Sequence, residues 1–148
     1  RGEYARAQQF VHHAMDLAAR TADASSIGEA TKLLGVIARE LGDLGEAEAQ
    51  FVRADEIASA RQDLLLQAEV ARERADLHKR QGRNKDVLLC LNRAHGLFMQ
   101  LRARHDLADV GRRMGRLEDE FVLVARRWGE SIEAKDRYTQ GHCVRVAD

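Results

Sequence analysis

Apolar residues recur along this chain at spacings of three and four, which is the pattern of helices that bury one face. The pattern predicts five helices, over about residues 3–20, 26–41, 44–60, 64–81 and 84–103, and a last helix that begins near Asp106. Proline is absent, so no residue forces a helix to stop internally. The expected fold class is therefore all-α.

The pattern also repeats along the chain. Three glycines are evenly spaced, at Gly2, Gly42 and Gly82. Apolar residues follow each glycine at offsets of five, nine and twelve, and after Gly42 these are Ala47, Phe51 and Ala54. Residues at such spacings share one helix face, and small residues there let two antiparallel helices approach closely. We therefore predict that each copy is a helical hairpin in which Ala47 and Ala54 are buried.

The glycines are expected to end the first helix of each hairpin, because glycine tolerates the left-handed conformation of a helix C-terminus. Asp43 is the expected N-cap of the next helix. Asp63 and Asp106 follow matching Ala-Arg-X sequences, and each is expected to cap a new hairpin. The helix over 3–20 is then the second half of a hairpin, and we expect the chain to be cut at both ends from a longer protein.

The best copy contains Leu33-Leu34-Gly35, Gly42-Asp43, Ala47, Phe51 and Ala54. These residues resemble the tetratricopeptide repeat, and the resemblance covers about residues 1–120. It implies a right-handed solenoid of antiparallel hairpins, here expected over 1–105, that binds peptides or partner domains and carries no chemistry of its own. Two features depart from the family. The period is 40 rather than 34, and Ser59 stands where the family often has proline.

The last helix has a different character. Val122 stands where a fourth glycine is due, and a heptad stripe runs through Leu107, Val110, Met114, Leu117, Phe121, Val124 and Trp128. The stripe predicts one long linker helix over about 106–134. Two alternatives follow: a monomeric helix packed on the last hairpin, or a parallel homodimer. In the dimer Phe121, Val124 and Trp128 form the seam, and Arg113 faces Glu118 of the second chain.

The C-terminal segment, 135–148, contains Asp136, Tyr138, Thr139, Gly141, His142, Arg145 and Val146. These residues resemble the opening of an HD-GYP domain, a bacterial phosphohydrolase family. Cys143 stands where that family usually has serine, and Arg137 stands where it often has proline.

This resemblance implies that His142 is the first metal-ligand histidine of a parent enzyme. That enzyme would use iron or manganese ions to activate a water that hydrolyses cyclic di-GMP. The other ligands would lie beyond Asp148, and a catalytic site usually needs three protein ligands. We therefore expect no cofactor, no bound metal and no catalysis in these 148 residues.

Basic residues also recur at the repeat period. Lys32, Arg72 and Arg112 occupy equivalent positions of successive copies, and Arg39 and Lys79 follow the first two by seven. The first helices of tetratricopeptide hairpins line a concave groove, so this basic ladder predicts binding of a carboxylate-bearing peptide or protein. The alternative is a solvated face whose charge is neutralised by Glu29, Glu69 and Asp76.

Composition excludes several other classes. Lys and Arg together number 24, as do Asp and Glu, so no basic excess favours nucleic acid. No apolar run approaches the roughly 18 residues of a membrane span. Cys90 and Cys143 form no disulfide framework or zinc spacing, which favours a reducing cytoplasm. Cys90, within an apolar run, is expected to be a small buried hydrophobic residue.

The two resemblances together imply the regulatory, partner-sensing region of a bacterial cyclic di-GMP phosphodiesterase-like signalling protein. The repeats would bind the partner and the long helix would pass the signal on. The alternative function is a stand-alone tetratricopeptide adaptor with no enzymatic domain.

Overall fold

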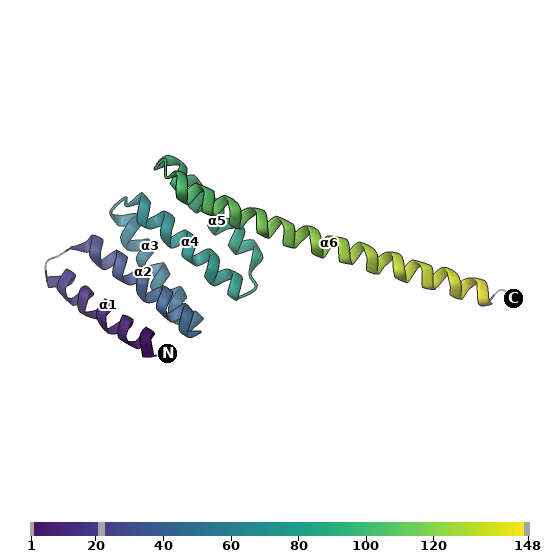
Figure 1. Ribbon diagram of the computed structural model, residues 1–148, viewed down its shortest axis with the longest axis horizontal. Coiled ribbons are helices and arrows are strands. Elements are labelled where there is room, and N and C mark those ends of the chain that lie inside the picture. The colour runs from purple at the N-terminus through teal and green to yellow at the C-terminus, as the bar shows by residue number, and fades with distance from the viewer. Residues whose placement is uncertain (1, 21–22, 147–148) are drawn as a thin grey trace. The chain divides into compact units, whose positions relative to one another are not determined.

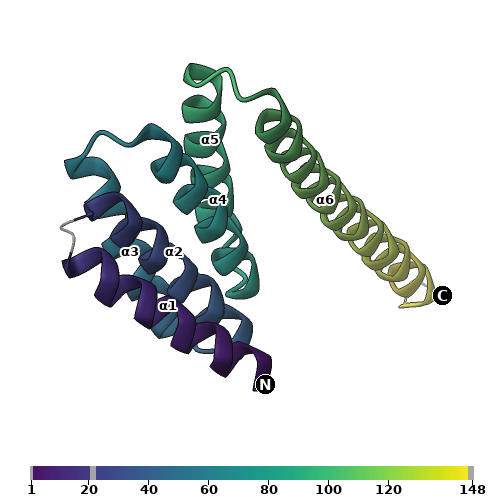
Figure 2. The same ribbon diagram turned by 60° about the vertical axis from the view of Figure 1, so that its left-hand side comes forward.

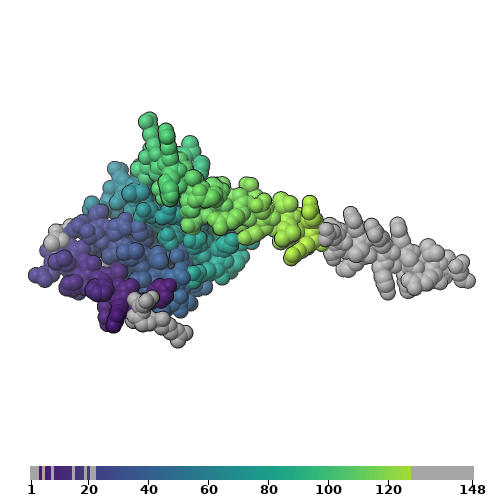
Figure 3. Space-filling model, in the orientation of Figure 1, coloured from purple at the N-terminus to yellow at the C-terminus, as the bar shows by residue number. Residues whose placement is uncertain are grey.

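All secondary structure is helical in the computed structural model, which describes the backbone of residues 2–20 and 23–146 (Figure 1). Along these residues six helices follow one another: α1 (Gly2–Arg20), α2 (Ala24–Leu41), α3 (Leu44–Ala60), α4 (Leu64–Arg80), α5 (Asn84–Gln100) and α6 (Arg104–Val146). Side chains are described for residues 4, 6–7, 9–14, 16–18, 20 and 23–127, and all others are grey in Figure 3. The expected all-α class is confirmed.

The chain divides into two compact units, residues 1–111 and 112–148, and α6 runs from the first into the second. Within the first unit, helices α1 to α5 lie side by side and consecutive helices run in opposite directions (Figures 1 and 2). The most extensive contacts join α2 to α3 and α4 to α5, which are the two expected hairpins. Smaller contacts join α1 to α2, α3 to α4, and α2 to α4.

The helices follow a period that is half of the sequence repeat. Helices α2 to α6 begin at Ala24, Leu44, Leu64, Asn84 and Arg104. At the end of α2, Gly42 has φ +90°; its N–H donates to the Arg39 carbonyl (3.1 Å) and the Asp43 N–H donates to the Ala38 carbonyl (2.9 Å). This pair of bonds is the Schellman motif, which satisfies carbonyls at a helix end.

The same two bonds close the next three turns, where the residues with positive φ are Gln62, Gly82 and Arg102. The expected glycine turns at Gly42 and Gly82 are thus confirmed. The alternate turns place ordinary side chains at φ 56° (Gln62) and 53° (Arg102), a region that non-glycine residues seldom occupy. The repeated backbone geometry, rather than glycine itself, sets the helix length.

Two of the three expected N-caps are confirmed. The Asp43 carboxylate accepts the N–H of Glu46 and the Asp63 carboxylate accepts the N–H of Leu66, each at 3.0 Å. The expectation for Asp106 is wrong, because α6 begins at Arg104 and Asp106 lies in its first turn. The repeat makes Ala103 the equivalent of Asp63, so the local match at Asp106 is out of register with the repeat.

The expected long helix is present, but the expected end near residue 134 is wrong. Helix α6 continues to Val146 and thus includes most of the segment that resembles an HD-GYP opening. A proline at position 137 would remove a helical hydrogen bond and clash with the preceding turn. Arg137 does neither, so the backbone continues without a break.

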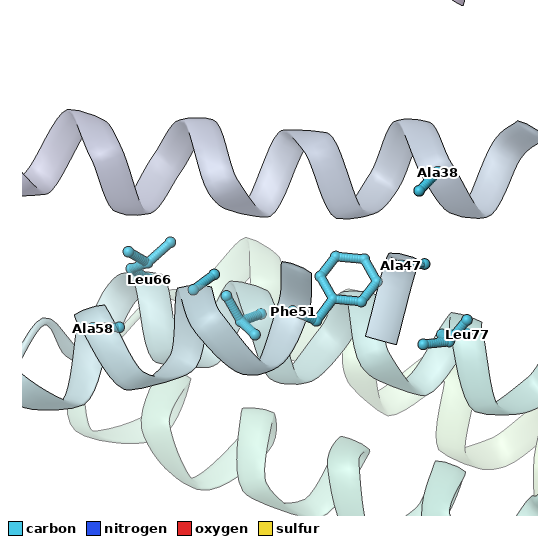
Figure 4. Close-up of a cluster of buried hydrophobic side chains, with 8 residues drawn as sticks. Ala38, Ala47, Phe51, Ala58, Leu66 and Leu77 are labelled. Atoms are coloured by element: carbon cyan, nitrogen blue, oxygen red, sulfur yellow. The ribbon is translucent and has the colours of Figure 1, made fainter. Parts of the chain in front are cut away.

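The centre of the first unit is a cluster of buried apolar side chains: Ala38, Ala47, Phe51, Ala54, Ala58, Leu66, Val70 and Leu77. Figure 4 shows Phe51 directed from α3 toward α2, the helix that carries Ala38. Ala47 and Ala54 are fully buried, which confirms the prediction made from the repeat. The small residues on this face let the two helices approach.

Gly35 is required where α2 passes over Phe51. A Cβ built on Gly35 would lie 2.7 Å from two carbons of the Phe51 ring, closer than carbon atoms pack. In the second hairpin the equivalent residues, 40 positions later, are Ala75 and Leu91, and both are buried. The first hairpin thus has glycine and a phenylalanine ring at these two positions, and the second has the larger alanine and the smaller leucine.

Gly35→Ala should therefore destabilise the protein by about 1–3 kcal/mol through overpacking. In a Phe51→Leu background, which copies the second hairpin, the same change should be neutral or stabilising, because alanine is favoured over glycine in a helix by up to about 1 kcal/mol. Denaturant unfolding of the four proteins of this cycle measures the coupling. Equal effects of Gly35→Ala in both backgrounds would show that the glycine is not needed for this contact.

Candidate binding face on the first helices of the hairpins

The basic ladder lies mostly on two helices in contact. Lys32 and Arg39 belong to α2, and Arg72 and Lys79 belong to α4. Because α2 touches α4, these helices bring their charged side chains together in the first unit. Arg112 belongs to the second unit, which is described by itself.

Lys32 is held between two carboxylates. Its Nζ lies 2.7 Å from a Glu29 oxygen on the same helix and donates a hydrogen bond to Glu69 on α4. Burial alone would lower the pKa of Lys32, but the hydrogen bonds to Glu29 and Glu69 outweigh it and raise the pKa above its ordinary value. The charged ammonium therefore links α2 to α4.

Arg39 is buried, with 6% of its surface exposed. Its Nη1 donates to the backbone carbonyl and to the carboxylate of Glu73 on α4, both at 3.0 Å. Its Nε donates to Glu40 at 3.2 Å, and its Nη1 lies 3.9 Å from the Asp76 carboxylate. A buried charge is tolerated only when it is paired in this way, so Arg39 fixes the position of α4 against α2.

Arg80 makes a third link between these helices, which the sequence interpretation missed. Its Nη2 donates to both carboxylate oxygens of Glu40 at 2.7 Å, and its Nη1 donates to the Arg39 carbonyl at 2.9 Å. The hydrogen bond from Arg80 is the main cause that lowers the pKa of Glu40. The available signal was that Glu40 and Arg80 hold opposite charges at equivalent positions of successive hairpins.

Arg72 extends the pattern to the start of α6. Its Nη1 donates to the Asp106 carboxylate at 2.8 Å. Its guanidinium carbon lies 5.7 Å from the centre of the Phe98 ring, within range of a cation–π interaction. Asp106 thus receives an arginine from the preceding hairpin instead of capping its own helix.

The ion pairs of Lys32 and Arg39 agree with the alternative interpretation, in which neighbouring carboxylates neutralise the charge of the basic ladder. Glu29 and Glu69 bind Lys32, and Asp76 lies near Arg39, as that alternative expects. The cations at these positions hold successive hairpins together. Binding by the face as a whole stays a prediction.

An open depression of about 440 Å³ lies on this face, lined by Arg39, Glu40, Asp76, Lys79 and Arg80. Three of the lining side chains are cationic and two are carboxylates. Lys79 and Arg80 are exposed, whereas Arg39 is buried. Exposed cations in such a depression are the groups that can contact a carboxylate from outside.

The heptad stripe on α6 divides into buried and exposed halves. Val110 and Leu117 are buried, whereas Phe121 is 54% exposed and Val124 is 46% exposed. Phe121 and Val124 are therefore open to a partner in the single chain. The side chains of Trp128 and His142, predicted as seam and metal ligand, lie outside the described side chains.

Cys90 is only half-buried, so its expected role as a buried hydrophobic residue is met in part. Burial raises the pKa of the Cys90 thiol, which keeps it protonated and poorly nucleophilic.

Over the described residues, no three His, Cys, Asp or Glu side chains gather as ligands for a metal ion. Within the same part of the chain, no helix combines the length and the apolar character that crossing a bilayer requires. No protein-family model matches the sequence, and no curated protein matches it significantly.

The lowered pKa of Glu40 predicts a pH-dependent contribution to stability. A carboxyl whose pKa is lowered by folding stabilises the protein fully above its unfolded value, about 4.5, and loses this contribution as the pH falls through the lowered value. Glu40→Gln should cost about 0.2–1 kcal/mol at pH 7 and progressively less below pH 4.5. Glu56→Gln, an exposed glutamate on α3, is the control for denaturant unfolding across this pH range. A cost for Glu40→Gln that does not change with pH would contradict the assignment.

Proposed function

We propose that this chain is a protein-interaction region of the tetratricopeptide kind, and that its first helices bind a partner segment rich in carboxylates. The observation that carries the proposal is the depression between α2 and α4, which is lined in part by the exposed cations Lys79 and Arg80. The hairpin repeat and the direct contact of α2 with α4 support the tetratricopeptide comparison. That family places its first helices along the partner-binding groove.

The partner chemistry follows from which cations of the depression face solvent. Arg39 is buried and uses its donors on Glu73 and Glu40, and Arg80 binds Glu40. Lys79 and Arg80 are the exposed cations that line the depression, and both already have partners within the chain, so an incoming carboxylate would add to these contacts. A flexible acidic peptide suits such a shallow, charged surface better than an apolar ligand, because its carboxylates remain partly solvated.

The wider function in this proposal is regulation of a bacterial HD-GYP phosphodiesterase for cyclic di-GMP. Its support is the sequence match around His142 and the continuous helix that leads from Arg104 into that segment. In the parent, His142 would bind one of the iron or manganese ions. A stand-alone adaptor is the second candidate. The coding sequence after Asp148 separates the two, since an HD-GYP domain requires a His-Asp pair and a later Gly-Tyr-Pro segment.

A homodimer through α6 completes the proposed signalling route. Phe121 and Val124 are exposed on the heptad stripe, so a second copy in parallel would bury them. Two parallel helices that rotate or slide when the repeats bind a partner would change how two following domains meet. The second copy is favoured because the stripe keeps heptad spacing as far as Trp128.

The binding proposal predicts that Lys79→Glu weakens binding of a synthetic poly-glutamate peptide by about tenfold or more, because it places like charges together. Lys85→Glu makes the same change at an exposed lysine on α5, away from the depression, and should have little effect. Titration calorimetry at low salt measures both. Equal losses in the two variants would show a non-specific charge effect instead of a site.

The dimer proposal predicts a concentration-dependent mass that Val124→Glu abolishes, because the change puts like charges opposite each other in the seam. Val122→Glu is the matched control, since Val122 is exposed but lies off the heptad stripe. Sedimentation from low to high micromolar concentration measures the mass of each protein. A wild-type chain that stays monomeric over this concentration range would show that the predicted seam does not form a dimer.

A further inference from the structure

An open groove of about 360 Å³ runs between α1 and α2. It is lined by Phe10, Val11, Ala14, Ser25, Ser26, Glu29, Ala30 and Leu33. Phe10 is 74% exposed and Leu33 is 46% exposed. The groove therefore presents apolar side chains to solvent, and the carboxylate of Glu29 lies among them.

The repeat supplies an internal comparison for this groove. Ala47, Phe51, Ala54 and Ala58 of α3 are fully buried. The residues 40 positions earlier, on α1, are Ala7, Val11, Ala14 and Ala18. Of these only Ala18 is buried, Ala7 and Val11 are half-buried, and Ala14 is exposed. The same helix face is thus covered on α3 and open on α1.

Helix α2 is what covers this face of α3 and the adjoining face of α4. Gly35 passes over the Phe51 ring, and Gly28 lies so close to Leu66 that a Cβ would be 2.6 Å from its methyl carbon. Two charged contacts add to this packing. Lys32 donates to Glu69, and Arg39 donates to Glu73.

Each of these four contact points has an equivalent in the open groove. The residues 40 positions before Phe51, Leu66, Glu69 and Glu73 are Val11, Ser26, Glu29 and Leu33, and all four line the groove. The groove thus keeps the form of the surface on which α2 lies. One acidic residue is retained at Glu29, and an apolar residue, Leu33, replaces the second.

We propose that the α1/α2 groove is the docking site of an amphipathic helix with the pattern of α2, namely the first helix of the hairpin that α1 completes. This helix carries a small residue over Val11, because the residue over Phe51 is Gly35 and its equivalent in the second hairpin is Ala75. It carries a cation over Glu29, as Lys32 lies over Glu69. Opposite Leu33 it carries an apolar residue in place of Arg39.

The register of this helix is set by the repeat. Gly2 stands 40 positions before Gly42, the C-cap of α2, so the repeat places the end of the docking helix just before Gly2, which in this chain is the first residue of α1. A second copy of residues 24–41, joined directly in front of Gly2 in place of Arg1, would therefore place its Lys32 over Glu29 and its Gly35 over Val11.

This grafted chain is the experiment that tests the proposal, with the full sequence from Gly2 retained. We expect a higher unfolding midpoint and amide exchange in α1 slowed by about tenfold or more, since burial protects backbone hydrogen bonds. The control is the same graft with Leu34→Glu and Ala38→Glu in the grafted copy, which keeps a helical sequence but makes its docking face charged. An equal gain from the control graft, or no protection of α1, would overturn the proposal.

A charge exchange tests the register, and the ungrafted Glu29→Lys protein is its reference because Glu29 also pairs with Lys32 of this chain. Glu29→Lys should reduce the gain that the graft gives, and Lys32→Glu in the grafted copy should restore it. If neither change alters the gain in unfolding midpoint, the grafted helix does not lie over Glu29 and the proposed register is wrong. A second copy of the chain is the other possible occupant of the groove. Sedimentation of a Val124→Glu variant tests it, because that change removes the proposed α6 seam. A dimer that persists in this variant and is lost on grafting would refute an in-chain helix.

Discussion

The first unit depends on the close approach of α2 to α3 and α4. Gly35 lets α2 pass over the Phe51 ring, and Gly28 lets it pass Leu66. Burial of apolar side chains drives this packing, and the absence of a side chain at the two glycines sets the distance between the helices. Once the helices are this close, the charged residues beside them reach across. The bonds from Arg39 to Glu73 and from Arg80 to Glu40 therefore follow from the small residues and do not replace them.

The contact also decides what the basic ladder can do. A row of cations on an isolated helix would attract any anion, but α2 and α4 lie close enough for Lys32 and Arg39 to find carboxylates within the chain. On α2 and α4 the exposed member of the ladder is Lys79, which lines the depression together with the exposed Arg80. The proposed site is consequently narrower and more specific than the sequence period suggests, because much of the charge already serves the packing of one hairpin on the next.

Local signals predicted the helices and two glycine turns, since caps and periodicity act within a few residues of each helix end. The sequence did not reveal positive φ at Gln62 and Arg102, because neither residue type marks such a turn. Asp106 was misassigned for a related reason: its surroundings resemble a cap, but its partner Arg72 lies 34 residues away. The charged pairs between hairpins join residues that are similarly distant in sequence, so they become visible only when the helices are placed side by side.

Two of the apolar surfaces that the described residues leave open have different periods, and the period determines which kind of helix each surface can pack against. Phe121 and Val124 continue a heptad, whose spacing keeps a seam facing a parallel helix over several turns. The α1/α2 groove instead follows the hairpin repeat, and its lining residues are the equivalents of those that α2 contacts. A helix on this groove would lie as α2 lies, with the small residue at its centre. The heptad spacing of the first surface thus suits a parallel helix, and the hairpin period of the second suits a helix with the pattern of α2.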